Sequence, residues 1–231
     1  MALLEVATGS TLGAVLGMRH ALEPDHLAAV STLVAEQRKS TQAVFLGICW
    51  GLGHTLALVA VGAVMIALRA EMSARMTDVF ELGVAMMLVA LGTRAIRRAA
   101  RQGPMGPSAM HQHGAIVHRH PALSKHVHVG RWTLARRPLV VGIVHGLAGS
   151  GALTALVLAT LPTSAARITY MVLFGVGSTF GMAMLSGLLG WPLARLGGHA
   201  RTWRTVSLVV GCLSTGLGIA WGAPLLAHLI R

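Results

Sequence analysis

The sequence predicts an all-α membrane protein with about six transmembrane helices, arranged as two inverted three-helix repeats. Of its 231 residues, 54% are hydrophobic and only 11% are charged, whereas a soluble domain carries about 25% charged residues. Six apolar runs approach or exceed the length of about 20 residues that crosses a bilayer. All seven acidic side chains lie within the first 81 residues. These features exclude an ordinary soluble globular protein.

The six runs form two groups of three on either side of one long connection. We place them at roughly 3–34, 43–68, 79–96, 140–161, 168–196 and 206–230. The expected organisation is a first repeat at 1–96, a basic His-rich loop at 97–137 and a second repeat at 138–231. No basic stretch precedes the first apolar run, so we expect no cleaved signal peptide.

The two halves resemble each other at an offset of about 125 residues. The matching positions are Gly17 and His20 with Gly142 and His145, Gly51, Gly53 and Thr55 with Gly175, Gly177 and Thr179, and Gly92 with Gly216. Because each half has an odd number of spans, the halves would have opposite orientations in the membrane. This architecture is common among secondary transporters.

The distribution of basic residues predicts the orientation. With the amino terminus outside, fourteen Lys and Arg residues near helix ends face inward and four face outward. Cytoplasmic loops carry the excess of basic residues, so we expect both termini outside and the His-rich loop in the cytoplasm of a bacterial cell, with the protein in its plasma membrane. Nucleic acid is not an expected partner, because the basic residues cluster between apolar runs and few aromatic residues are present to stack on bases.

One segment places five ionisable groups inside the first apolar run. Ionisable side chains at membrane depth are costly and are functional candidates by default. Pro24 cannot donate the backbone bond to the carbonyl of His20, so we expect that carbonyl to be free and the helix to break. Such a break would bring together side chains that a straight helix separates. The five groups are Arg19, His20, Glu23, Asp25 and His26.

A structural explanation of this segment is also open. Arg19 could pair with Glu23 at i,i+4, and the two histidines could serve packing alone. We favour a metal site, with Glu23 paired with Arg19 beside it, because two imidazoles and a carboxylate beside a helix-breaking proline provide suitable ligands for a divalent transition metal.

His54 is a second candidate ligand, in a helix where Gly51 and Gly53 permit close helix approach. The alternative is a core histidine bonded to Ser or Thr on a neighbouring helix, and Thr55 follows it directly. His145 occupies the repeat position of His20, but the nearby acids are replaced by Ala148 and Ser150. We therefore expect His145 to support or gate the site.

The connection between the halves contains three His-x-His pairs. In an extended chain, residues two apart face the same side, so each pair could chelate a transition metal. A solvated basic loop near anionic lipid is the alternative. The pairs are His111/His113, His118/His120 and His126/His128.

These segments resemble the nickel/cobalt transporter family, most closely its short six-helix urease-accessory branch. The family's helix signature, Arg-His-Ala-x-Asp-Ala-Asp-His, is matched at Arg19, His20, Ala21, Asp25 and His26, while Glu23 and Pro24 replace its first Asp and second Ala. Its Gly-His-Ser/Thr element is matched at Gly53, His54 and Thr55. The resemblance implies that His20, Asp25, His26 and His54 select and carry the metal. The acidic motifs that larger members have in later helices are missing from the nearest segment, 174–182.

The sequence thus favours a secondary transporter of Ni²⁺ or Co²⁺, with uptake as the expected direction. No phosphate-binding loop is present to support ATP-driven pumping. We expect no resident cofactor and no enzymatic activity, and partners limited to the metal ion, the bilayer and cytoplasmic metallochaperones or nickel-enzyme accessory proteins. Two alternatives are a metal efflux protein of the same architecture and an integral membrane acyltransferase that uses His20 as base and Asp25 to orient it.

Overall fold

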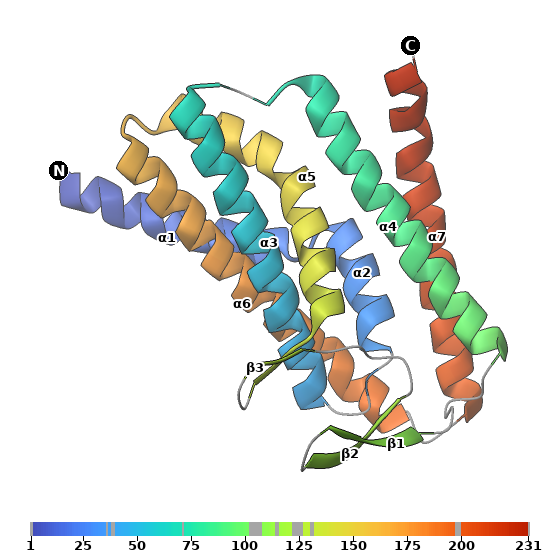
Figure 1. The fold of residues 1–231 in the computed structure, drawn as a ribbon. Helices are drawn as coiled ribbons and strands as arrows, with labels where there is room; N and C mark the ends of the chain where they lie inside the picture. The colour runs from blue at the N-terminus through green and yellow to red at the C-terminus, as the bar shows by residue number, and fades with distance from the viewer. Residues whose placement is uncertain are drawn as a thin grey trace.

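The computed structural model consists of a bundle of helices with short strands at one end (Figure 1). It describes residues 2–35, 37, 40–70, 72–101, 108–113, 116–121, 127–129, 132–196 and 200–230. The helices are α1 (Ala2–His20), α2 (Pro24–Val34), α3 (Ser40–Leu68), α4 (Ala74–Arg101), α5 (Arg136–Thr160), α6 (Ser164–Leu196) and α7 (Ala200–Ile230).

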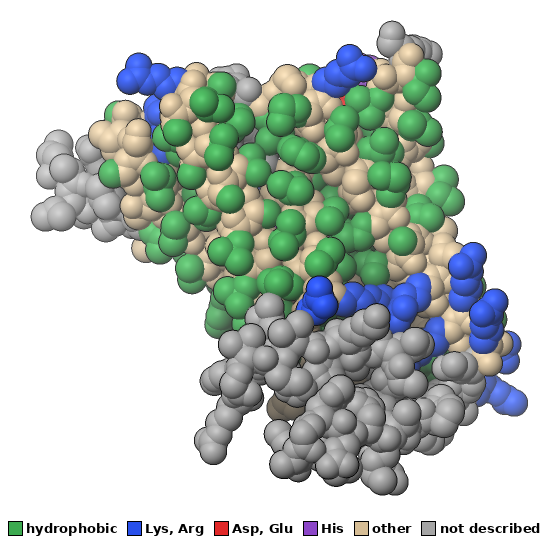
Figure 2. Space-filling view, in the orientation of Figure 1, with side chains coloured by type: hydrophobic (Ala, Val, Ile, Leu, Met, Phe, Trp, Pro, Cys, Tyr) green, Lys and Arg blue, Asp and Glu red, His purple; other side chains and the backbone are tan. Residues whose placement is uncertain are grey.

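Four segments in the described part of the chain are long and apolar enough to cross a membrane. They are Ser40–Leu68, Ala74–Arg101, Ser164–Leu193 and Arg201–Ile230. Large apolar side chains cover the visible face of the bundle, while Lys and Arg gather mainly at the end near the strands (Figure 2). Because such an apolar exterior suits lipid rather than water, the protein is an integral membrane protein.

The first apolar run, expected as one span at 3–34 with a helix break at Pro24, is not one continuous helix. It forms two helices, α1 and α2, separated by residues 21–23. Figure 1 shows α1 running across the longer helices and α2 turning down between them. The other expected runs correspond to α3 to α7, and each of these helices begins a few residues before the apolar stretch.

The helices around the candidate site form two groups: α1, α3, α5 and α6 in one, and α4 with α7 in the other. The long helix α3 packs against α5 and α6, α1 packs against α6, and α4 packs against α7. The shorter α2 contacts α3, α4, α6 and α7 and so joins the groups. Its buried residues Val30 and Val34 share a core with Trp50, Leu88 and Met182.

The connection between α4 and α5 adds short strands to the helices. Strand β1 (Ser108–His113) pairs antiparallel with β2 (Ile116–Pro121), and β3 (Val127–Val129) pairs with β4 (Trp132–Leu134). On either side of this connection, α4 continues to Arg101 and α5 begins at Arg136. The fold is helical in its bundle but carries these two hairpins at one end.

Candidate metal centre

The break between α1 and α2 brings the ionisable segment into the bundle. Glu23 precedes Pro24 and has an extended backbone, with φ −64° and ψ 149°. A proline disfavours the helical conformation of the residue before it, so the chain leaves one helix at His20 and starts the next at Pro24. His20 therefore ends α1, and Asp25 and His26 lie in the first turn of α2.

Two expectations about this turn are wrong. The carbonyl of His20 is not free, because it accepts a hydrogen bond from the Glu23 N–H at 3.0 Å. In the described part of the chain, the ion pair of Glu23 joins its Oε1 to Nδ1 of His20 at 2.8 Å rather than to Arg19. The physical reason is that Glu23 lies beyond the end of α1, so the i,i+4 geometry of a continuous helix is lost.

Asp25, in the first turn of α2, contacts two histidines. Its Oδ1 accepts a hydrogen bond from the backbone N–H of His26 at 2.9 Å and lies 2.9 Å from Nδ1 of the same residue. A carboxylate is favourable in this position, because the N–H groups of a first helical turn lack partners within the helix. Its Oδ2 lies 3.5 Å from Nε2 of His145 on α5.

His20 and His26 share one arrangement. In each, Nδ1 contacts a carboxylate, Glu23 or Asp25, and Nε2 is buried without a hydrogen-bond partner among the described residues. A carboxylate on one ring nitrogen holds the proton there and leaves the lone pair of the other nitrogen for a metal. Asp25 and Glu23 are thus placed to orient imidazoles.

His54 of α3 completes a group of three imidazoles. One ligand nitrogen from each of His20, His26 and His54 lies within 4.8 Å of the others. The ring centroid of His20 is 4.6 Å from that of His26 and 5.2 Å from that of His54. His54 is fully buried, and neither of its ring nitrogens has a partner in the described part of the structure. The alternative of a His54 bonded to Ser or Thr is therefore not observed among these residues.

A second group meets the first at His26. Asp25, His26 and His145 offer ligand atoms within 4.8 Å of one another, and the rings of His26 and His145 are 4.6 Å apart. His145 also lies 3.3 Å, through Nδ1, from the carbonyl of Val141. The structure thus brings His145, expected to support or gate the site, into direct contact with its carboxylate.

The backbones of α3 and α5 are in close contact, because glycines lie where the two helices meet. A side chain on Gly142 would collide with the carbonyl of Trp50, and one on Gly53 would collide with the carbonyl of Leu139. These glycines let the two backbones touch, as small residues do at membrane helix interfaces. His54 and His145 lie on the helices joined in this way.

Aromatic walls around the site were not identified from sequence. Trp50 is fully buried, with its ring 5.4 Å from His26 and 5.5 Å from His145. Phe174 of α6 lies 5.3 Å from His20. The position of Trp50, one helical turn before His54, was a signal that could have identified it.

Thr55 contacts α6 and is not part of the imidazole group that its neighbour His54 completes. Its hydroxyl donates to the carbonyl of Gly175 at 2.8 Å and lies 3.0 Å from the hydroxyl of Thr179. Thr55 therefore ties α3 to α6 beside the imidazole group.

The loop histidines are described only in part. His111 and His113 lie in β1, His118 and His120 in β2 and His128 in β3, with His111 opposite His118 in the register. His126 lies outside the described residues. The expected metal contacts of these side chains also lie outside the described part.

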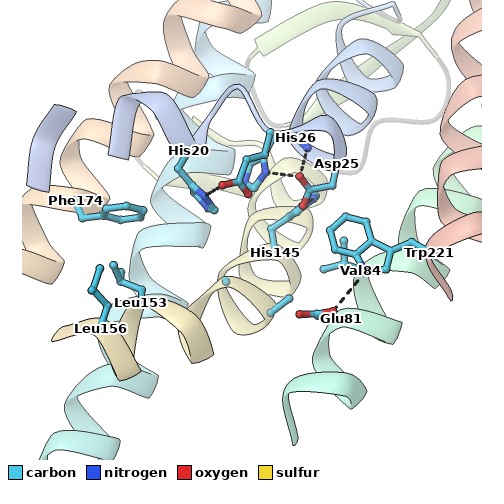
Figure 3. Close-up of a pocket in the computed structure, with 13 residues that line it drawn as sticks. His20, Asp25, His26, Glu81, Val84, His145, Leu153, Leu156, Phe174 and Trp221 are labelled. Carbon is cyan, nitrogen blue, oxygen red and sulfur yellow. Dashed lines mark hydrogen bonds and ion pairs between the residues drawn. The ribbon is translucent and has the colours of Figure 1, made fainter. Parts of the chain in front are cut away.

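A cavity of about 350 Å³ opens beside both groups. Figure 3 shows His20, Asp25, His26 and His145 on one side of this space and Glu81 with Trp221 further along it. Leu153, Leu156 and Phe174 form the apolar part of the wall.

The fold and this cluster define a helical membrane protein whose interior holds imidazoles and carboxylates of the kind that bind divalent transition metals. The chain belongs to the NicO family, whose profile is described as high-affinity nickel-transport protein and matches residues 9–223.

Relatives agree with this assignment. The chain is 32% identical to urease accessory protein UreH of Bacillus sp. strain TB-90, over 90% of its own length and 88% of the relative. It is 27% and 26% identical to the chloroplast proteins FOR GROWTH AND FERTILITY 1 and 2 of Arabidopsis thaliana, over 79% and 80% of its own length. It spans about half the length of those two proteins. No solved structure matches the chain significantly.

Proposed function

We propose that this protein is a secondary transporter that takes up Ni²⁺, Co²⁺ or both through the site formed by His20, Asp25, His26 and His54. The observation that carries the proposal is the convergence, inside the bundle, of imidazole nitrogens that have no hydrogen-bond partner among the described residues. Leaving buried polar groups unpaired is costly, and a transported cation would satisfy them. Membership of a nickel-transport family supports the choice of metal.

The charge of the site suits transport. Imidazole ligands and one carboxylate, Asp25, leave a bound divalent ion only partly neutralised, so that it can be stripped of water and still be released. An inside-negative potential of 100 mV would favour inward movement of a divalent cation by about 4.6 kcal/mol, twice the value for a single charge. Uptake therefore needs no coupled ion on energetic grounds, whereas efflux requires one.

The acyltransferase alternative has little support. It requires Asp25 to orient His20, but the recorded partner of His20 Nδ1 is Glu23, and Asp25 contacts His26 and His145.

We further propose that the two halves are related by an inverted repeat of six spans. Reciprocal contacts support it: Gly17 lies against the carbonyl of Phe174 as Gly142 lies against that of Trp50. The expected match between Gly92 of α4 and Gly216 of α7 is not seen as a pair of equivalent contacts. Gly92 and Gly218 lie against backbone of the facing helix, whereas Gly216 faces open space.

In the proposed topology, both termini face outward and the His-rich loop faces the cytoplasm of a bacterial cell. The concentration of Lys and Arg near the strands supports this orientation (Figure 2). The loop histidines would capture released metal for cytoplasmic metallochaperones or nickel-enzyme accessory proteins, a role in keeping with the name of the UreH relative.

Radioactive nickel uptake into proteoliposomes of known orientation tests the function. We expect saturable uptake by the purified protein, competition by Co²⁺, and weaker competition by Mg²⁺ and Ca²⁺, which prefer oxygen ligands. Absence of uptake at every imposed membrane potential would overturn the proposal, and export alone would favour the efflux alternative.

A further inference from the structure

Glu81 is a carboxylate that the site described above does not use. It lies on α4 and lines the same cavity as His20, Asp25, His26 and His145 (Figure 3). Three of the seven carboxylates in the whole chain, Glu23, Asp25 and Glu81, line this one cavity. No Lys or Arg is found among the described residues of its wall. The cavity is therefore lined by negative charge in a protein whose net charge is +12.

Trp221 fixes the position of the Glu81 carboxylate. Its indole N–H donates to Oε2 of Glu81 at 3.4 Å. Trp221 is brought there by Gly218 and Gly222, which lie close against Ala85 on α4. An indole is only a donor, so this contact orients the carboxylate without neutralising its charge.

The other end of the cavity holds buried imidazoles of the proposed site. His26 and His145 both line it, and each is only 2% exposed. The Nε2 atom of His26 has no hydrogen-bond partner among the described residues. A cation in this cavity would thus meet a carboxylate at one end and an open imidazole nitrogen at the other.

Glu81 lies on the side of the bundle away from the strands. It is in the second turn of α4, whose beginning is at the opposite end from β1 and β2 (Figure 1). In the proposed topology this end faces outward. A cation arriving for uptake would therefore reach the level of Glu81 before the imidazole groups.

We propose that Glu81, oriented by Trp221, forms an outer binding position for a hydrated divalent cation and passes it to His26 and Asp25. This inference rests on the proposed transport function and adds a second position to its path. Charge–charge attraction is stronger in a partly buried cavity than in water, so one carboxylate raises the local cation concentration. Movement between neighbouring positions also allows binding that is favourable at each position yet permits release.

The test compares Glu81→Gln with the parent in nickel uptake by proteoliposomes. We expect KM to rise about tenfold, with the maximal rate within twofold of the parent, because the loss affects capture rather than transfer. Trp221→Phe keeps the apolar ring but removes the indole N–H, and we expect a smaller rise in KM of about threefold. Glu81→Asp should retain more affinity than Glu81→Gln.

Asp78→Asn provides a matched control. Asp78 lies one turn earlier on α4 and pairs with exposed His228 at 2.7 Å, and it is not among the lining residues. This variant removes the same charge from the same helix, and its KM should stay within twofold of the parent. An equal rise in both variants would show a general surface-charge effect and overturn the inference.

The outcomes separate the two proposals. No saturable uptake by the parent overturns the proposed function. Uptake by the parent together with an unchanged KM in Glu81→Gln, or a lowered maximal rate at constant KM, overturns only the role of Glu81. If Glu81→Gln does not give a monodisperse protein in detergent, Trp221→Phe decides, and an unchanged KM in that variant overturns the inference.

Discussion

The Nε2 atom of His145 lies 3.5 Å from Oδ2 of Asp25, although 120 residues separate them in the chain. This contact joins α5 of the second half to α2 of the first. Asp25 therefore contacts two imidazoles, one on each of its oxygens. A candidate site concentrated in one segment of sequence thus depends on both halves of the molecule.

Replacing His145 tests that dependence. We expect His145→Ala to lower the apparent affinity for nickel about tenfold, because residues that support metal ligands typically contribute 10-fold to 100-fold. The KM of uptake in proteoliposomes measures the effect. Parental kinetics in this variant would show that His145 only fills space.

Replacing the central ligands should have a larger effect. We expect His20→Ala, His26→Ala and His54→Ala each to abolish saturable nickel uptake while the protein still reaches the membrane. Asp25→Asn, which preserves volume but weakens its hold on His26, should reduce affinity 10-fold to 100-fold. Glu23→Gln should be milder, because its side chain is 51% exposed. Parental rates in all three His variants would contradict the proposed site.

Pro24 controls the turn that brings His20 to His26. Pro24→Ala removes the steric restriction on Glu23 and allows α1 and α2 to become more continuous. We expect at least a tenfold loss of uptake, measured alongside circular dichroism to show that helix content is retained. A fully active Pro24→Ala variant would mean that packing alone maintains the break.

Glycine contacts predict a stability difference between matched variants. In Gly17→Ala or Gly142→Ala, the added methyl group collides with backbone of the facing helix, which should cost about 1–3 kcal/mol. Gly83→Ala and Gly216→Ala are the controls, because nothing lies within 4 Å of a Cβ at either position. Thermal unfolding in detergent should show lower midpoints for the first pair only. Equal midpoints in both pairs would contradict the close helix approach.

Thiol labelling tests the proposed orientation. Single cysteines at Gln112 and Ala2 are introduced after Cys49 and Cys212 have been replaced by Ser. In intact cells, a membrane-impermeant reagent should modify the cysteine at position 2 and not that at position 112. The reverse pattern would invert the topology and would place Glu81 on the cytoplasmic side.

The sequence by itself determined the features that depend on local composition and covalent structure. Long apolar runs identify the membrane helices, because each must satisfy its backbone hydrogen bonds internally in lipid. Pro24 determined where the first run breaks, because its ring restricts the preceding residue whatever surrounds it. The ionisable segment from Arg19 to His26 was therefore recognisable as the candidate site.

The tertiary structure alone decided which side chains meet. His54 and His145 reach His26 because small residues let α3 and α5 touch, and Glu81 meets Trp221 through the packing of α4 on α7. The expected pairing of Glu23 with Arg19 was wrong: Glu23 pairs with His20 instead, because a turn after His20 takes the place of a continuous helix. Helix crossings arise from many weak contacts between residues far apart in the chain, and no local pattern of sequence specifies them.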